Sequence, residues 1–291
     1  MNKPLVGALL SLTLVGAGAA PALALQPADS TATATAKTAP AKPAPALKAV
    51  DFAGTVALSN CSGSLIRTPS SQPNDPALIL SNGHCLETGF PGPGEVITDQ
   101  ASSRTFSLLN GSAGRVATLR ASKVAYATMT DTDISVYQLN TTYAQIQSRY
   151  GISALTLNDA HPAAGSAIKV VSGYWKRTYS CNVDGFVYRL KEGDWTWKDS
   201  VRYTSACQTI GGTSGSPVID TTTGKVVAVN NTGNEDGESC TENNPCEVDE
   251  NGNVSVHYKI NYAQETYIIV PCIGAGNKFD LNRPGCTLPK P

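Results

Sequence analysis

A serine set among glycines is the first candidate for chemistry in this sequence. Residues 210–220 read IGGTSGSPVID, so Ser214 lies in a tight polar turn that leads into a short apolar strand. Gly212 and Gly215 permit backbone dihedrals that other residues avoid. Such a turn can aim the amides of Gly212 and Ser214 at one point, and one donor aimed at a developing oxyanion contributes roughly 10²–10³ in rate. A glycine-serine turn without chemistry is the plain alternative.

A serine nucleophile needs a general base, and that base needs a third group to orient it. The candidates for the base are His84, His161 and His257. His84 lies in the sequence LSNGHCL at 80–86, a turn of small residues, whereas His161 precedes a proline in a polar loop and is expected to be solvated. Asp133 begins the apolar run DISVYQL, so its carboxylate can lie buried at a strand start. Asp131 is the competing acid. This combination indicates nucleophilic acyl transfer.

Four motifs in this order resemble those of the chymotrypsin-fold, or trypsin-like, serine peptidases: CSGSLI at 61–66, NGHC at 82–85, DISV at 133–136 and GTSGSP at 212–217. The ending SGSP is most similar to the bacterial branch that includes the glutamyl endopeptidases. The resemblance covers residues 50–273. It implies a general base at His84, an orienting acid at Asp133, a nucleophile at Ser214 and an oxyanion hole formed by the amides of Gly212 and Ser214. Neither a cofactor nor a metal ion is predicted.

The residues expected to bind the substrate side chain are Gln208, Thr209 and Asn230. Relatives that cleave after basic residues carry an aspartate where this chain has Gln208. A buried cation without a counter-charge is costly, so cleavage after Arg or Lys is not expected. Thr209 matches the glutamyl-specific branch, but Asn230 stands where that branch has a histidine. We predict an uncharged side chain at the cleavage site, with glutamate as the alternative if His257 lies in the pocket.

Residues 1–24 have the pattern of a secretory signal peptide, with Lys3, an apolar run and the small-residue site ALA at 22–24. Residues 25–48 are rich in Ala, Thr and Pro, which predicts a disordered linker or pro-segment. We therefore predict a secreted, extracellular protein that makes no membrane contact after signal cleavage. Eight cysteines in an exported chain predict four disulfides. The sequence does not fix their pairing, and our choice is neighbouring cysteines: Cys61–Cys85, Cys181–Cys207, Cys240–Cys246 and Cys272–Cys286.

Residues 49–291 are predicted to form one peptidase domain. Short apolar runs separated by turn residues favour an all-β fold. We expect two packed antiparallel six-stranded β-barrels, barrel 1 about 49–155 and barrel 2 about 156–273, with the active site between them and a C-terminal helix. Helices are expected at 143–150 and 261–270. Strands are expected at 56–58, 63–66, 77–80, 115–119, 123–127 and 134–139, then at 167–172, 180–190, 195–204, 217–220, 225–230 and 254–260.

The charge of the chain is nearly balanced, with 22 basic and 23 acidic residues, which is unlike a nucleic-acid-binding protein. We predict a monomeric serine endopeptidase that acts on protein or peptide substrates. A catalytically silent binding protein on the same fold is one alternative. A serine esterase is another, although its G-x-S-x-G turn needs glycine where this chain has Ser216. The acidic loop 235–253 is a solvated loop, a pocket rim that repels acidic substrates, or a weak calcium site formed by Asp249, Asn251 and Asn253.

Overall fold

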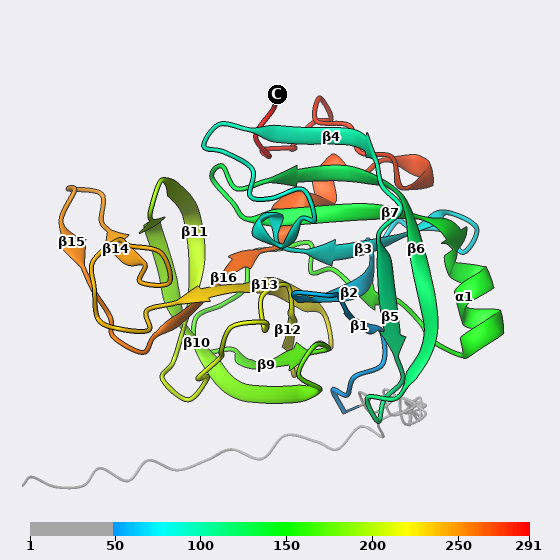
Figure 1. Cartoon of the computed structure of the whole chain (residues 1–291), viewed down its shortest axis with the longest axis horizontal. Coiled ribbons are helices and arrows are strands. Elements are labelled where there is room, and N and C mark those ends of the chain that lie inside the picture. The colour runs from blue at the N-terminus through cyan, green and yellow to red at the C-terminus, as the bar shows by residue number, and fades with distance from the viewer. Residues whose placement is uncertain (1–48) are drawn as a thin grey trace, which may run out of the picture. The chain divides into compact units, whose positions relative to one another are not determined.

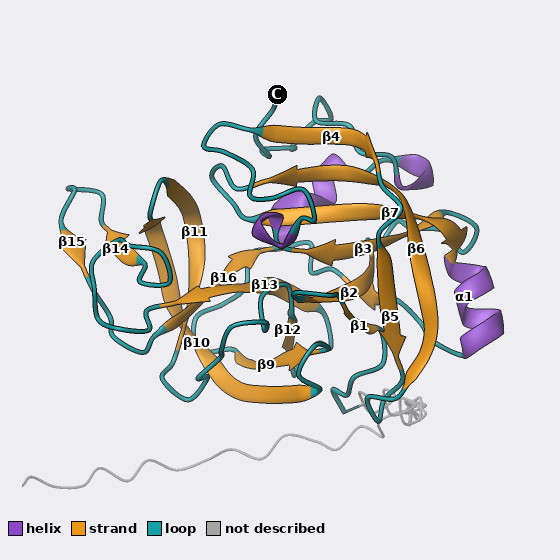
Figure 2. Cartoon of the chain, viewed as in Figure 1, coloured by secondary structure: helices purple, strands orange, loops and turns teal. Residues whose placement is uncertain are grey.

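The computed structural model describes residues 49–291, so the predictions for residues 1–24 and 25–48 lie outside it. Strands dominate the described chain, and Figures 1 and 2 show them in two neighbouring groups. Within residues 49–291 the single α-helix is α1 (Tyr143–Tyr150), the first of the two predicted helices. It begins with a capping box formed by Thr142 and Gln145, and it ends at Gly151, whose φ of 67° favours glycine.

The first barrel is a closed ring of six antiparallel strands in the order β1-β5-β6-β7-β3-β2, because β1 pairs with both β5 and β2. Strand β4 pairs with β6 outside the ring, and β8 adds to β2 in parallel. The bounds are β1 (Thr55–Ala57), β2 (Ser62–Arg67), β3 (Pro76–Ser81), β4 (Val96–Ala101), β5 (Thr105–Leu109), β6 (Arg115–Thr128), β7 (Ile134–Thr142) and β8 (Leu155–Thr156).

The second barrel is also a ring of six antiparallel strands, in the order β11-β16-β13-β12-β9-β10, and it closes through the pairing of β10 with β11. A small hairpin, β14 and β15, extends it from β10. The bounds are β9 (Ala167–Ser172), β10 (Arg177–Glu192), β11 (Trp195–Tyr203), β12 (Pro217–Asp220), β13 (Val226–Gly233), β14 (Cys246–Val248), β15 (Val254–Ser255) and β16 (Asn261–Glu265). The predicted pair of six-stranded barrels is confirmed.

Each barrel has its own apolar core, and a third core lies between the two barrels. This shared core brings Leu80 and Val136 of the first barrel together with Val171 and Val229 of the second. All four side chains are fully buried, and burying an aliphatic side chain of this size contributes about 1.5–3 kcal/mol. Apolar packing therefore fixes the barrels against each other, and the candidate catalytic residues lie along this seam.

The C-terminal part of the predicted secondary structure is wrong. The last barrel strand is β16 rather than 254–260, and the predicted helix at 261–270 is replaced by that strand and a 3-10 helix, Tyr267–Cys272. All five residues of β16 are buried although Asn261, Gln264 and Glu265 are polar. Strands are usually recognised from apolar residues that alternate with exposed polar ones. Because β16 buries polar residues as well, its sequence lacks that alternation.

The four predicted disulfides are present. Their pairs are Cys61–Cys85, Cys181–Cys207, Cys240–Cys246 and Cys272–Cys286. No helix within residues 49–291 is long and apolar enough to cross a membrane.

Candidate active site

His84 lies in a single 3-10 turn, Gly83–Cys85, which follows β3. Gly83 has no room for a side chain, because a Cβ atom there would lie 2.3 Å from the carbonyl oxygen of Thr128. The Cys61–Cys85 disulfide ties the turn to the start of β2. The turn is thus fixed on both sides of the histidine.

Asp133 contacts His84 at two points. His84 Nδ1 lies 2.6 Å from Asp133 Oδ2, and the backbone N–H of His84 donates to Oδ1 at 3.1 Å. Asp133 is fully buried directly before β7. Burial lowers the pKa of His84, but the charge and hydrogen bond of Asp133, together with the charge of Glu192, outweigh burial and raise that pKa above its usual 6.5. The carboxylate holds the proton on Nδ1, which leaves the Nε2 lone pair to accept a proton.

Asp131, the competing acid, lies elsewhere. Its carboxylate forms an ion pair with Lys198 on β11 and is partly exposed. Only one residue separates it from Asp133 in the sequence, yet the turn before β7 directs the two side chains to different partners. Asp133 is therefore the acid that the structure brings to His84.

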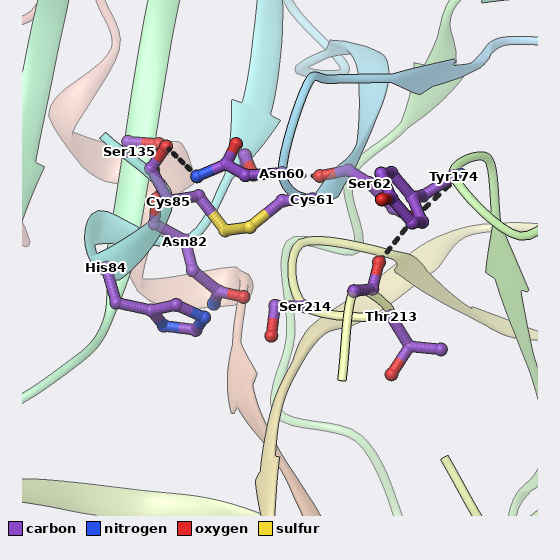
Figure 3. The surroundings of a disulfide bond; sticks show 12 residues. Asn60, Cys61, Ser62, Asn82, His84, Cys85, Ser135, Tyr174, Thr213 and Ser214 are labelled. Atoms are coloured by element: carbon purple, nitrogen blue, oxygen red, sulfur yellow. Dashed lines mark hydrogen bonds between the residues drawn. A yellow bond between two sulfur atoms is a disulfide. The ribbon is translucent and has the colours of Figure 1, made fainter. Parts of the chain in front are cut away.

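The serine turn approaches His84 from the second barrel (Figure 3). Gly212 and Gly215 both have positive φ, 84° and 80°, as expected from the sequence of the turn. A Cβ atom on Gly215 would lie 2.1 Å from the carbonyl oxygen of Ser62. The backbone N–H of Ser62 donates to the carbonyl oxygen of Ser214 at 2.8 Å. These contacts seat the turn directly on β2 of the first barrel.

Two amides at this turn have no acceptor among the described residues. The N–H groups of Gly212 and Ser214 donate no hydrogen bond to any residue in the range 49–291. Ser214 Oγ donates to the carbonyl oxygen of Asn231 at 3.3 Å rather than to His84. Catalytic hydrogen bonds are often long or misaligned without substrate, so this geometry is compatible with a nucleophile at rest.

A series of hydrogen bonds between buried side chains supports the serine turn. Thr213 Oγ1 donates to the carbonyl oxygen of Ile210 and accepts a hydrogen bond from Asn230 Nδ2 at 3.2 Å. Asn230 Oδ1 in turn accepts a hydrogen bond from Tyr203 at 3.1 Å. Asn230 lines the pocket as predicted, but both of its polar ends are used to hold the turn.

The pocket beside Ser214 contains Thr209 but not Gln208. Thr209 Oγ1 donates to Asn261 Oδ1 at 2.7 Å, and both residues line the pocket. Gln208 is exposed and donates instead to the carbonyl oxygens of Ser205 and Lys259. His257 is also absent from the lining, and its Nε2 lies 3.6 Å from Glu247.

Glu192 is a pocket residue that the sequence did not predict. It ends β10, is 8% exposed, and accepts a hydrogen bond from the Asn243 backbone at 2.8 Å. Burial raises the pKa of the Glu192 carboxyl above its usual value. The residue lines the pocket together with His84, because the end of the long β10–β11 hairpin lies at the site. Nothing in the sequence around Glu192 indicates that position.

Arg104 is a second residue that the sequence did not predict, and it supports the histidine turn. Its guanidinium is buried and donates to the carbonyl oxygen of Cys85, to Tyr137 Oη at 2.8 Å and to Asn60. An arginine before a strand normally indicates a solvated residue, since arginine is rarely fully buried. Its role is visible only from its contacts in the folded protein, with residues that are distant in the sequence.

A search of curated proteins found no match. Among solved structures, the MamO protease domain from Magnetospirillum magneticum is 12% identical, covers 75% of this chain and 95% of its own, and has a TM-score of 0.47. The active form of Rv3671c protease from M. tuberculosis is 13% identical, with 83% and 85% coverage and a TM-score of 0.47. The protease Anisep from Arthrobacter nicotinovorans is 17% identical, with 76% and 93% coverage and a TM-score of 0.45.

The model of the trypsin-like peptidase domain matches residues 61–229, which include the histidine turn, Asp133 and the serine turn. This match extends over more than half of the sequence, and the chain therefore belongs to the trypsin-like peptidase family.

Proposed function

We propose that this protein is a secreted serine endopeptidase. The observation that carries the proposal is the meeting of the His84–Asp133 pair with Ser214 in one pocket, beside two amides that have no other partner among residues 49–291. A silent binding protein has no need for this combination. Peptide bonds are the substrate class of the family to which the chain belongs.

The chemistry follows from the positions of the atoms. Ser214 Oγ leaves Asn231, turns toward His84 Nε2 and attacks the peptide carbonyl while its proton passes to Nε2. The amides of Gly212 and Ser214 stabilise the oxyanion that forms. His84 then gives the proton to the leaving amine as the C–N bond breaks, which leaves an acyl-serine. Water attacks that ester by the same route and releases the acid. Asp133 holds the imidazole tautomer throughout.

The carboxylates that line the pocket disfavour an acidic side chain at the cleavage site and suit an uncharged or a basic one. Glu192, Glu235 and Glu242 all line the pocket, and like charges across a binding surface repel, so an acidic side chain is disfavoured. His257 lies outside the lining, which removes the cation that a glutamate substrate would need. The similarity to the glutamyl endopeptidase branch therefore remains a prediction from sequence motifs and does not extend to substrate preference.

Export is part of the proposal. The signal-like pattern at residues 1–24 and four disulfides support an oxidising, extracellular destination. Mass mapping of the N-terminus of protein recovered from the culture medium tests cleavage after Ala24.

Labelling with a serine-directed fluorophosphonate, followed by profiling on a mixed peptide library, tests the activity. We expect the wild type to be labelled once and to cleave peptides, and Ser214→Ala to do neither. Ser216→Ala is the matched control, because Ser216 is a buried serine of the same turn whose Oγ has no partner among the described residues. An unlabelled wild type would support the silent binding protein, and cleavage of esters without peptides would support the esterase.

A further inference from the structure

Three side chains that can bind metal ions meet in the second barrel, away from the serine. His161 lies in the loop before β9, Asp199 lies on β11, and Glu265 is the last residue of β16. Asn261, which lines the pocket, begins the same strand four residues earlier, so Glu265 is about 13 Å farther along it. These residues come from distant parts of the sequence, which is why no spacing rule reveals them.

The ligand atoms stand at distances that suit a coordinated cation. His161 Nε2 lies 3.2 Å from Asp199 Oδ2 and 3.1 Å from Glu265 Oε1. All three atoms lie within 4.8 Å of one another. Ligands bound tetrahedrally at the usual zinc distances, about 2.0–2.2 Å, are roughly 3.3 Å apart. The cluster therefore has the dimensions of a three-ligand site with open positions for water.

Glu265 points into this cluster without a hydrogen-bond donor of its own. It is 3% exposed, and neither carboxylate oxygen is hydrogen-bonded to any residue within 49–291. Buried carboxylates in proteins are normally hydrogen-bonded, paired or bound to a metal ion. A cation between Glu265 and Asp199 would supply the hydrogen-bonding or ionic partner that Glu265 lacks.

His161 is oriented as a metal-binding histidine is. Its Nδ1 lies 2.8 Å from the carbonyl oxygen of Pro162, so Nδ1 carries a proton and Nε2 is the ring nitrogen that faces the two carboxylates. Histidine ligands usually donate their other N–H to a carbonyl or carboxylate in this way. The rings of Phe186 and Tyr267 pack against the imidazole at centroid distances of 4.2 and 5.4 Å. Tyr267 also donates to Asp199 Oδ2 at 3.3 Å, which supports that carboxylate.

We propose that His161, Asp199 and Glu265 form a binding site for a divalent transition-metal ion, with Zn²⁺ as the best match. One imidazole nitrogen and two carboxylate oxygens suit zinc, whereas calcium prefers oxygen ligands alone. His161 and Asp199 are 40% and 45% exposed, so the ion and its water ligands can enter from solvent. The ion would tie together the loop before β9, β11 and β16. The site is independent of the proposed peptidase activity.

Calorimetric titration of the EDTA-treated, dialysed protein with ZnCl₂, combined with thermal unfolding, tests the site. We expect one equivalent to bind and Tm to rise by about 5–10 °C at a hundredfold excess over Kd. His161→Ala and Glu265→Gln should abolish both effects. His257→Ala is the matched control, because it removes another partly exposed histidine near a carboxylate and should bind as the wild type does.

Two results would overturn the proposal. One is a wild-type Tm that does not rise with Zn²⁺, which would mean that the cluster holds only protons. The other is Zn²⁺ binding by His161→Ala or Glu265→Gln that equals the wild type. Zn²⁺ bound at His84 would persist in both variants and would appear as inhibition of peptide cleavage, so it is distinguishable. Because Glu265→Gln keeps the shape of the side chain, it tests the site even if His161→Ala lowers stability.

Discussion

Replacing Asp133 with asparagine tests the reasoning about the histidine tautomer. In the native site one carboxylate oxygen accepts from the His84 backbone N–H at 3.1 Å, and the other lies 2.6 Å from Nδ1. The backbone N–H can only donate, so in Asp133→Asn the amide oxygen of the new side chain must remain opposite it. The NH₂ group then faces Nδ1 and turns that nitrogen into an acceptor. The proton moves to Nε2, and the imidazole can no longer accept the serine proton.

The size of the effect follows from the same contacts. Restoring the active tautomer puts the proton back on Nδ1, where it faces the NH₂ group of the new asparagine. If the amide flips instead, its NH₂ group faces the backbone N–H of His84. Either way, two buried donors face each other. Leaving two buried groups unsatisfied costs about 2–6 kcal/mol. Losing the Asp133 charge also removes stabilisation of the imidazolium. Together these effects predict a loss of about 10⁴ in kcat, equivalent to about 5.5 kcal/mol.

The assay is kcat on a peptide chosen from the library, with the folded fraction measured by circular dichroism. Asp131→Asn is the matched control and should stay within about threefold of wild type, since Asp131 pairs with Lys198 on a partly exposed surface, where ion pairs contribute little. If Asp133→Asn kept a tenth of wild-type kcat while Asp131→Asn lost activity, the assignment of the orienting acid would be refuted.

Three further predictions concern the surroundings of His84. The kcat/KM should rise with pH through a midpoint above 6.5, because the pKa of His84 is raised and the base must be neutral; Glu192→Gln should lower that midpoint by removing a negative charge. Arg104→Ala should lower the free energy of unfolding in urea by about 3 kcal/mol, because buried acceptors lose their donor. Removing Cys61–Cys85 should cost about 3.4 kcal/mol against about 2.2 kcal/mol for Cys240–Cys246, from loops of 24 and 6 residues.

Controls separate these effects from general damage. Glu235→Gln also removes a pocket carboxylate. Glu235 is not among the charges that raise the pKa of His84, so this substitution should leave the pH midpoint of kcat/KM unchanged. Arg115→Ala removes an exposed arginine and should change stability by less than about 0.5 kcal/mol. A pH optimum below 5, an Arg104→Ala protein as stable as wild type, or a reversed order of the two disulfides would each contradict the corresponding prediction.

The parts of this protein that could be predicted from sequence are those fixed by neighbouring residues. Helix α1 carries its own start and stop signals, the Thr142–Gln145 box and Gly151, and the serine turn carries its own glycines. Strand β6 shows a limit of local reading, because polar residues near its middle make one strand of 14 residues resemble two short ones.

The missed features depend on contacts between distant segments. Glu192 reaches the pocket only because the end of the β10–β11 hairpin lies there, and buried Arg104 finds its acceptors at Cys85 and Tyr137. Glu265 lies in a strand whose polar residues face the interior, so neither its strand nor its partners have a sequence pattern. Local sequence signals identified the motif residues, whereas the residues that surround and support them could be identified only from the folded structure.

The hydrogen bond from the Ser62 backbone to Ser214, and the lack of space at Gly215, make the nucleophile turn depend on the opposite barrel. In the proposed peptidase, a chain in which only one barrel has formed has either His84 without Ser214 or a serine turn without the β2 contacts that hold it. Catalytic competence is then the last property gained during maturation and the first lost when the halves separate. Half-folded copies of such a protease are the substrates nearest to one another. Because a half-folded copy has no complete catalytic site, these copies do not cleave each other.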